Sequence, residues 1–154
     1  MIGNHSYLPS VRTRLSRVGT TLVEMCVVLA VVAALFTIAL PRLRDASDRS
    51  AARGAVQEVG SLFSLARRAA VARRAGVRVV IDTTVGTITV RIGGTVLVRR
   101  GLRAEFGVRM IASRDSMSYD PRGLGYGAAN LTVVARRGRA AETLYVSRLG
   151  RTRH

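Results

Sequence analysis

The sequence contains no lysine or tryptophan, and it has one cysteine, two histidines and three prolines among 154 residues. The single cysteine, Cys26, excludes an intramolecular disulfide and a zinc site built from spaced thiolates. Because Cys26 lies within a long apolar run, we interpret it as a small apolar residue. His5 and His154 stand too far apart in the sequence to form a local ligand or catalytic motif.

Acidic residues are also few, with nine against 25 basic residues, all arginine, for a formal net charge of +16. This charge has two interpretations: a solvated basic surface, or attraction to phosphates and acidic lipid head groups.

The nine acidic residues are scattered along the sequence. Asp115 and Asp120 flank a Ser/Tyr segment, where we expect turn residues rather than a metal site. The glycines of 123–127 lack the strand–helix setting of a dinucleotide site and predict a loop. We expect neither an enzyme nor a cofactor.

The sequence has one long apolar run, from Thr20 to Leu40, 21 residues in which Glu24 is the only charge. About 20 apolar residues suffice to span a bilayer as a helix. Because the preceding segment is basic, the N-terminus is expected on the cytoplasmic side and the domain after residue 76 on the other. Two alternatives stay open: a secretory signal cut after Thr37-Ile38-Ala39, and an uncut signal anchor.

The residues around this run resemble the class III signal of type IV prepilins and type II secretion pseudopilins. The resemblance rests on Gly19-Thr20-Thr21-Leu22-Val23-Glu24, the apolar residues that follow, and Pro41. It implies that a prepilin peptidase cuts between Gly19 and Thr20 and methylates the new amino group of Thr20, where the family usually has Phe or Met. It also implies that Glu24 neutralises the α-amine of a neighbouring subunit during filament assembly. Pro41 is expected to kink the helix.

A second helical segment, 42–76, is predicted to be amphipathic. Small or apolar residues recur every three or four positions, as expected for one helix face: Ala52, Val56, Val59, Phe63, Ala66 and Ala70. Gly54 and Gly60 weaken this helix, and Gly76 is expected to end it just after Ala75.

From Val77 onward the apolar period changes to two, which indicates strands. The predicted strands are Val77–Asp82, Thr87–Ile92, Thr95–Arg99, Phe106–Ile111, Ser116–Tyr119, Leu131–Ala135 and Thr143–Arg148. Gly93-Gly94 predicts a two-residue hairpin turn, and Arg137-Gly138-Arg139 predicts another. The fold class is therefore α+β, a long N-terminal helix packed on a small antiparallel sheet or sandwich. The expected parts are a leader (1–19), a transmembrane assembly helix (20–41), its amphipathic extension (42–76) and a β-rich domain (77–154).

The order of these parts resembles the GspH/FimT branch of minor pilins and pseudopilins. The resemblance rests on Leu62-Phe63-Ser64-Leu65-Ala66-Arg67, on Tyr119-Asp120-Pro121-Arg122-Gly123, and on the ending from Tyr145 to Arg153. It implies a minor pseudopilin of a type II secretion system, anchored once in the inner membrane. Its expected partners are the prepilin peptidase, other pilins or pseudopilins, and membrane lipid.

The resemblance leaves a second function open, because FimT-like members of the branch bind DNA for uptake through arginines near their C-terminal end. The matching candidates here are Arg148, Arg151 and Arg153, with Arg136, Arg137 and Arg139 in a predicted turn. Aromatic residues are few, so duplex or non-specific binding is the expected mode. A third interpretation is an anchored domain outside any filament, which would require Gly19 to stay uncut.

Overall fold

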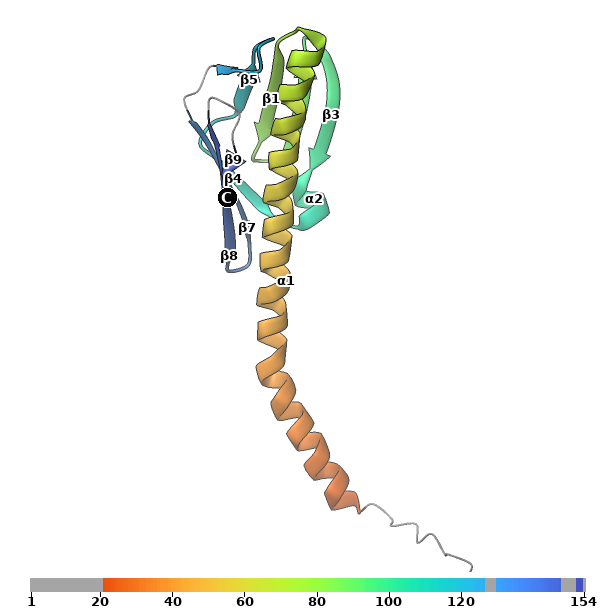
Figure 1. Ribbon diagram of the computed structural model, residues 1–154. Coiled ribbons are helices and arrows are strands. Elements are labelled where there is room, and N and C mark those ends of the chain that lie inside the picture. Colours follow the sequence, from red (N-terminus) through yellow and green to blue (C-terminus); the bar gives the residue numbers. More distant parts are fainter. Residues whose placement is uncertain (1–20, 127–129, 148–151, 154) are drawn as a thin grey trace, which may run out of the picture. The chain divides into compact units, whose positions relative to one another are not determined.

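The computed structural model describes residues 21–126 and 130–147 and the backbone of Thr152 and Arg153. Its contacts divide the chain into two units, Met1–Ile38 and Ala39–His154. In the first unit the described residues form the beginning of helix α1 (Leu22–Arg73), which continues through Pro41 into the second unit. Figure 1 shows this helix and the strands of the second unit.

Two antiparallel sheets form the rest of the second unit. Sheet A has the order β3-β2-β1-β5-β6, with β1 (Val77–Asp82), β2 (Thr87–Ile92), β3 (Thr95–Gly101), β5 (Ser116–Tyr119) and β6 (Gly125–Tyr126). Sheet B has the order β4-β7-β8-β9, with β4 (Arg109–Ala112), β7 (Asn130–Arg137), β8 (Ala140–Ser147) and β9 (Thr152–Arg153). A short helix, α2 (Leu102–Phe106), connects β3 to β4.

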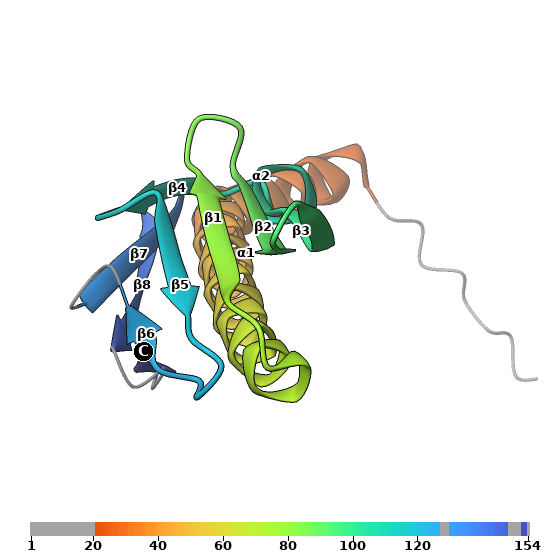
Figure 2. The same ribbon diagram turned by 90° about the horizontal axis from the view of Figure 1, so that it is seen from above.

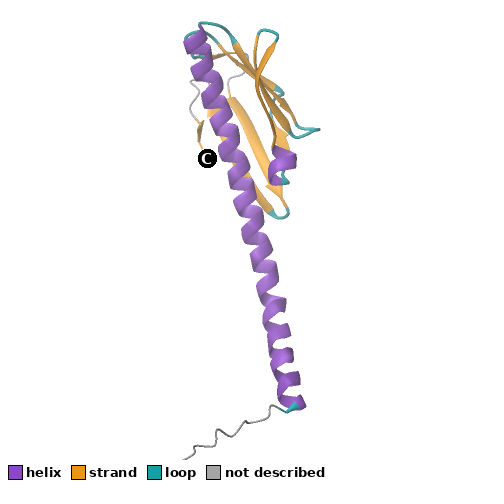
Figure 3. Cartoon of the chain, turned by 90° about the vertical axis from the view of Figure 1, so that its right-hand side faces the viewer, coloured by secondary structure: helices purple, strands orange, loops and turns teal. Residues whose placement is uncertain are grey.

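The core lies between the second half of α1 and the inner faces of both sheets. All six residues of the predicted helix stripe, from Ala52 to Ala70, are buried. They face alternate residues of the strands, such as Val79 on β1 and Val133 on β7, which are fully buried. Figure 2 shows β1 lying along the helix, and Figure 3 shows most strands on one side of it. The predicted α+β fold, a long helix on antiparallel sheets, is confirmed.

Some local predictions are wrong, among them the bounds of two strands of sheet B: β7 begins one residue before the predicted Leu131 and ends two after Ala135, and β8 begins three residues before the predicted Thr143. The predicted strand Phe106–Ile111 is instead the end of α2 followed by β4, because Gly107 takes a left-handed conformation (φ 65°) and its N–H closes on the carbonyl of Arg103. The predicted loop of 123–127 contains strand β6, which pairs Tyr126 with Ser118. Strand β3 extends two residues beyond the predicted Arg99, to Gly101.

The stop signal of α1 also differs from the prediction. The helix ends at Arg73, and the left-handed residue that follows it is Arg74 (φ 48°), not Gly76. Ala75 N–H bonds the carbonyl of Ala70, and Arg74 N–H bonds that of Val71, which is the pattern of a Schellman motif. A Cβ at Gly76 would meet the Tyr126 hydroxyl at an ordinary contact distance of 3.5 Å, so the packing there does not require glycine.

Candidate functional site

The first candidate site is the apolar part of α1. Its large apolar side chains are exposed, among them Leu22 (80%), Leu29 (65%) and Ile38 (62%). An 18-residue window within the helix has a mean hydropathy of 2.6 and no residue buried inside the protein. By length and composition the helix can cross a membrane, and it fits a single-pass anchor. Lipid or neighbouring helices would cover a surface that is unsuited to water.

Glu24 occupies the first turn of this helix. The backbone N–H of Glu24 donates to the side-chain hydroxyl of Thr21 at 3.2 Å, so Thr21 caps the helix and Glu24 stands three residues beyond the cap. Thr21 thus accepts one of the N–H groups at the start of the helix that have no partner within the helix. A carboxylate in the first turn is also favoured by the helix dipole. Glu24 makes no ion pair within the part of the chain that the structure describes. Its charge therefore remains available to another molecule.

The polar groups deeper in the apolar segment need internal partners, because lipid offers none. The hydroxyl of Thr37 donates to the carbonyl of Ala33 at 2.9 Å, one turn earlier. Pro41 has no N–H, so the carbonyl of Thr37 lacks its usual helical partner. The helix nevertheless continues past Pro41. A kink at this residue stays a prediction, as does the assembly role of Glu24.

The proposed cleavage and methylation site, Gly19 and Thr20, lies outside the described residues. The same holds for Arg148 and Arg151, two of the candidate DNA-binding arginines. Of Arg153 only the backbone is described, in strand β9, where it pairs with Tyr145 of β8. The C-terminal part of the DNA hypothesis therefore stays a prediction.

The remaining three arginines differ in their surroundings. Arg137 is engaged: its Nε lies 3.1 Å from Oδ1 of Asp48, and its Nη1 donates to the carbonyl of Phe106 at 2.9 Å. Arg136 and Arg139 are exposed. Arg136 stands directly opposite Arg109 of β4, which is exposed as well. Like charges directly opposite on a sheet are destabilising, so this pair forms a local concentration of positive charge.

Asp115 and Asp120 were expected to be turn residues, and the structure shows this role for Asp120. Asp120 Oδ1 accepts from the N–H groups of Arg122 and Leu124 at 2.9 and 2.8 Å, as a turn residue does. Asp115 is exposed, and its carbonyl accepts from Ile81 at 2.7 Å. No group of three or more His, Cys, Asp or Glu residues that could hold a metal occurs among the described residues.

Tyr119 is a polar residue in the core that the sequence did not lead us to expect there. Tyr119 is fully buried, and its hydroxyl has no hydrogen-bond partner among the residues that the structure describes. Burial raises the pKa of Tyr119 to about 12, and the nearby charge of Arg67 opposes this effect. The alternation of β5 predicts an inward side chain at 119, but the lack of a partner depends on the tertiary packing.

Comparison with known proteins identifies the family. Residues 55–150 match the family described as type II transport protein GspH. The chain belongs to the GspH family. This match begins within α1 and extends past β8, so it covers the helix stripe from Val56 onward, all of sheet A, and strands β4, β7 and β8 of sheet B. The protein is thus similar to minor pseudopilins and type IV minor pilins, which are structural subunits.

Solved structures with the same fold come from both kinds of machine. Two crystal forms of the type IV minor pilin FimU of Pseudomonas aeruginosa PAO1 align with TM-scores of 0.59 and 0.55 at 15% and 13% identity; these alignments cover 70% and 66% of this chain and 90% of FimU in each case. The minor pseudopilin EpsH of the Vibrio cholerae type 2 secretion system aligns with a TM-score of 0.52 at 12% identity, covering 66% of this chain and 94% of EpsH. These likenesses show the fold alone. A comparison with curated proteins gives no match.

Proposed function

We propose that this protein is a minor pseudopilin of a type II secretion system, held in the inner membrane by α1 with the β-domain outside the cytoplasm. The observation that carries the proposal is the combination of the GspH family match with an exposed apolar helix that is capped by Thr21 and carries Glu24 in its first turn. In this proposal the prepilin peptidase removes residues 1–19. The α1 helices of neighbouring subunits then pack side by side in a short filament.

Glu24 gives this proposal a mechanism. An unpaired carboxylate within a bilayer is unfavourable by roughly 2.5–3.5 kcal/mol on insertion scales, so pairing it with a cation is strongly favoured. Cleavage before Thr20 would leave an α-amine four residues away from Glu24. The amine of one subunit and the carboxylate of the next would neutralise each other as the helices associate. The cap at Thr21 places Glu24 in the first turn of α1, where such an amine would approach.

The test is filament incorporation in the native host. Wild-type protein, produced from the full-length sequence, should appear in its processed form in the sheared or purified filament fraction together with other pilin-like subunits, whereas Glu24→Gln should remain in the membrane fraction. Glu105→Gln is the matched control, because Glu105 is an exposed acid in the first turn of α2. Equal incorporation of Glu24→Gln and wild type would overturn the assembly role. A wild-type chain that never joins such subunits would overturn the function.

A second candidate function, DNA binding by a type IV minor pilin, is favoured by one observation. Arg109 and Arg136 are exposed and directly opposite on sheet B, and Arg139 follows in the next turn. Each phosphate neutralised on duplex DNA lowers the logarithm of affinity by about 0.9 per tenfold rise in salt. If this surface binds DNA, Arg136→Gln together with Arg139→Gln should weaken binding and reduce that slope. Substituting Arg148, Arg151 and Arg153 tests the C-terminal segment in the same way.

A further inference from the structure

The outer face of sheet A places two arginines side by side without an acidic partner. Arg78 of β1 stands directly opposite Arg91 of β2, and both are exposed. Like charges in this arrangement destabilise a sheet. The ion pairs of the described residues use other arginines, namely Arg53, Arg100 and Arg137, so neither Arg78 nor Arg91 pairs with a carboxylate within that part of the chain.

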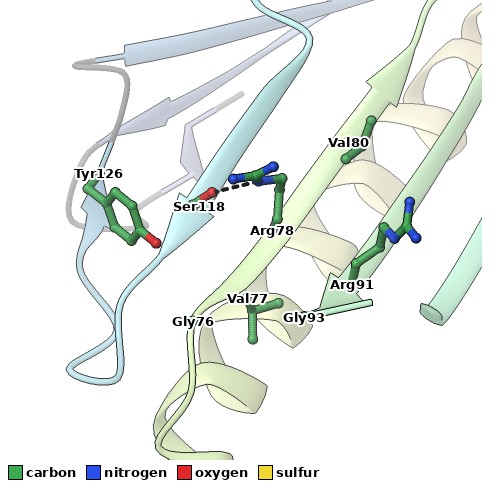
Figure 4. Close-up of a pocket in the computed structure, with 8 residues that line it drawn as sticks. All are labelled: Gly76, Val77, Arg78, Val80, Arg91, Gly93, Ser118 and Tyr126. Atoms are coloured by element: carbon green, nitrogen blue, oxygen red, sulfur yellow. Dashed lines mark hydrogen bonds between the residues drawn. The ribbon is translucent and has the colours of Figure 1, made fainter. Parts of the chain in front are cut away.

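Hydroxyl groups extend this row across the sheet. Ser118 of β5 stands opposite Arg78, and Tyr126 of β6 stands opposite Ser118. Arg78 Nε donates to Ser118 Oγ at 3.4 Å, while Arg91 Nη2 donates to the carbonyl of Gly94 at 3.2 Å. Figure 4 shows that the Arg78 side chain turns toward Ser118 and that of Arg91 turns away from it. Each guanidinium carries five N–H donors, so most of them remain available to a ligand.

The four side chains line a recess of about 400 Å³. Its other lining residues are Gly76, Val77, Val80 and Gly93, which present no charge (Figure 4). The recess thus combines two cations with two hydroxyl groups and no acid. Such a set of donors matches the paired oxygens of a carboxylate or phosphate, because Arg forms short, charge-assisted bonds to both.

A second recess, of about 320 Å³, adjoins the first and shares Val80 and Arg91 with it. Its lining includes Val85, which is 61% exposed, Asp82 and a third exposed arginine, Arg99. The Asp82 carboxylate accepts from the N–H groups of Thr84 and Val85, which holds it at this end of the sheet. Arg99 adds a cation that attracts any anion, whereas the fixed Asp82 carboxylate and the exposed Val85 side chain disfavour a continuous phosphate backbone. They suit a peptide that carries an apolar side chain.

We propose that the outer face of sheet A binds an acidic segment of a partner protein. A Glu or Asp carboxylate of the partner occupies the recess between Arg78 and Arg91, and an apolar side chain of the same segment packs on Val80 and Val85. The net charge of +16 favours an acidic partner over a second copy of this chain. This interaction is separate from filament assembly through α1, so its failure would leave the proposed function standing.

The test measures the binding of three labelled peptides to the full-length protein, purified in detergent micelles, by fluorescence anisotropy. One peptide contains Glu-Ser-Leu repeats, the second has Gln in place of Glu, and the third has Ser in place of Leu. The Glu-Ser-Leu peptide should bind more tightly than either of the other two. Arg78→Gln together with Arg91→Gln should lower its affinity about tenfold or more, as expected for the loss of charge-assisted hydrogen bonds.

Arg68→Gln with Arg73→Gln is the matched control, because it removes two exposed charges from the helix. It should change the affinity less than about twofold. Val85→Ser should lower the affinity for the Glu-Ser-Leu peptide but not for the peptide without Leu. This variant tests the second recess without changing any charge. If both double variants lost the same affinity for the Glu-Ser-Leu peptide, the binding would be a general electrostatic attraction to the basic protein, and the proposal would be overturned. The proposal would also be overturned if Arg78→Gln/Arg91→Gln lowered the affinity for a duplex DNA probe but not the affinity for the acidic peptide.

Discussion

Arg137, at the end of strand β7, pairs with Asp48 of helix α1: its Nε lies 3.1 Å from Oδ1 of the aspartate. The same guanidinium donates to the carbonyl of Phe106, so it joins the helix, α2 and sheet B. Gly138 follows with φ 54°, and a Cβ at that position would collide with the Asp48 carboxylate. The turn predicted at Arg137-Gly138-Arg139 therefore needs glycine for both its backbone conformation and its close contact.

This contact gives a first prediction. Arg137→Ala should lower the free energy of unfolding by about 1–2 kcal/mol, because it removes a partly exposed ion pair and a hydrogen bond to a backbone carbonyl. Arg136→Ala should change it by less than about 0.5 kcal/mol, because Arg136 is exposed on the other face. Chemical unfolding of the full chain in detergent measures both. Equal effects would contradict the structural role of Arg137.

Substitution of Gly138 gives a second prediction. Gly138→Ala should lower the free energy of unfolding by about 1–2 kcal/mol, since an L-residue is disfavoured at positive φ. Asp48→Ala in the Gly138→Ala background should recover part of that loss by removing the colliding carboxylate. The unfolding free energies of the two single variants and the double variant form a cycle that measures this coupling. Purely additive losses would show that the collision is unimportant.

The two glycines inside α1 give a third prediction, with opposite outcomes. A Cβ at Gly60 would have no heavy atom within 4 Å outside its own helical turns, whereas a Cβ at Gly54 would lie 2.9 Å from Cε1 of Phe106. Gly60→Ala should therefore raise the free energy of unfolding by about 1 kcal/mol through helix propensity. Gly54→Ala should not show this increase in the free energy of unfolding, because the Phe106 ring must move to make room for the new Cβ. Thermal unfolding of both variants decides between these outcomes, and an equal gain would contradict the contact at Gly54.

Tyr119 gives a fourth prediction, on pH dependence. The phenol ionises near pH 10 in an unfolded chain, and its pKa is about 12 in the folded protein. The folded state therefore holds the proton more tightly, and its stability should fall as the pH rises from 10 toward 12. At pH 11 the loss should be about 1 kcal/mol relative to pH 8. Tyr119→Phe should lack this component of the pH dependence.

The same variant tests the unpartnered hydroxyl. A buried hydroxyl without a hydrogen bond is unfavourable by about 1–3 kcal/mol. Tyr119→Phe should therefore be at least as stable as wild type at pH 8. A loss of more than about 1 kcal/mol at that pH would mean that the Tyr119 hydroxyl has a partner after all.

Local patterns predicted much of the fold. Strands β1, β2 and β5 begin and end where the period of two indicated, and the buried stripe of α1 follows the predicted spacing from Ala52 to Ala70. The pattern was misleading at Phe106, Val108 and Met110, which alternate like a strand across Gly107 although a helix ends there. The end of α1 was misplaced because a non-glycine residue, Arg74, adopts the left-handed conformation.

The candidate sites were less accessible to sequence reasoning. The Glu24 motif is local, so its residues could be recognised together, whereas the helix cap at Thr21 was not predicted. The row of Arg78, Arg91, Ser118 and Tyr126 depends on strand order, because β5 pairs with β1 from 40 residues away. Likewise, the partners of Arg137 come from α1 and α2, which no spacing within 136–139 could reveal.

The most direct test of the filament-subunit account is the N-terminal mass of the protein purified from its native membrane. The account predicts a mature chain that begins at Thr20, with or without one added methyl group. That result would place Glu24 as the fifth residue of the mature chain, next to the α-amine that the assembly mechanism requires. A chain that retains Met1, or one cut near Ala39, would contradict processing before the apolar helix and would leave an anchored or secreted β-domain outside any filament.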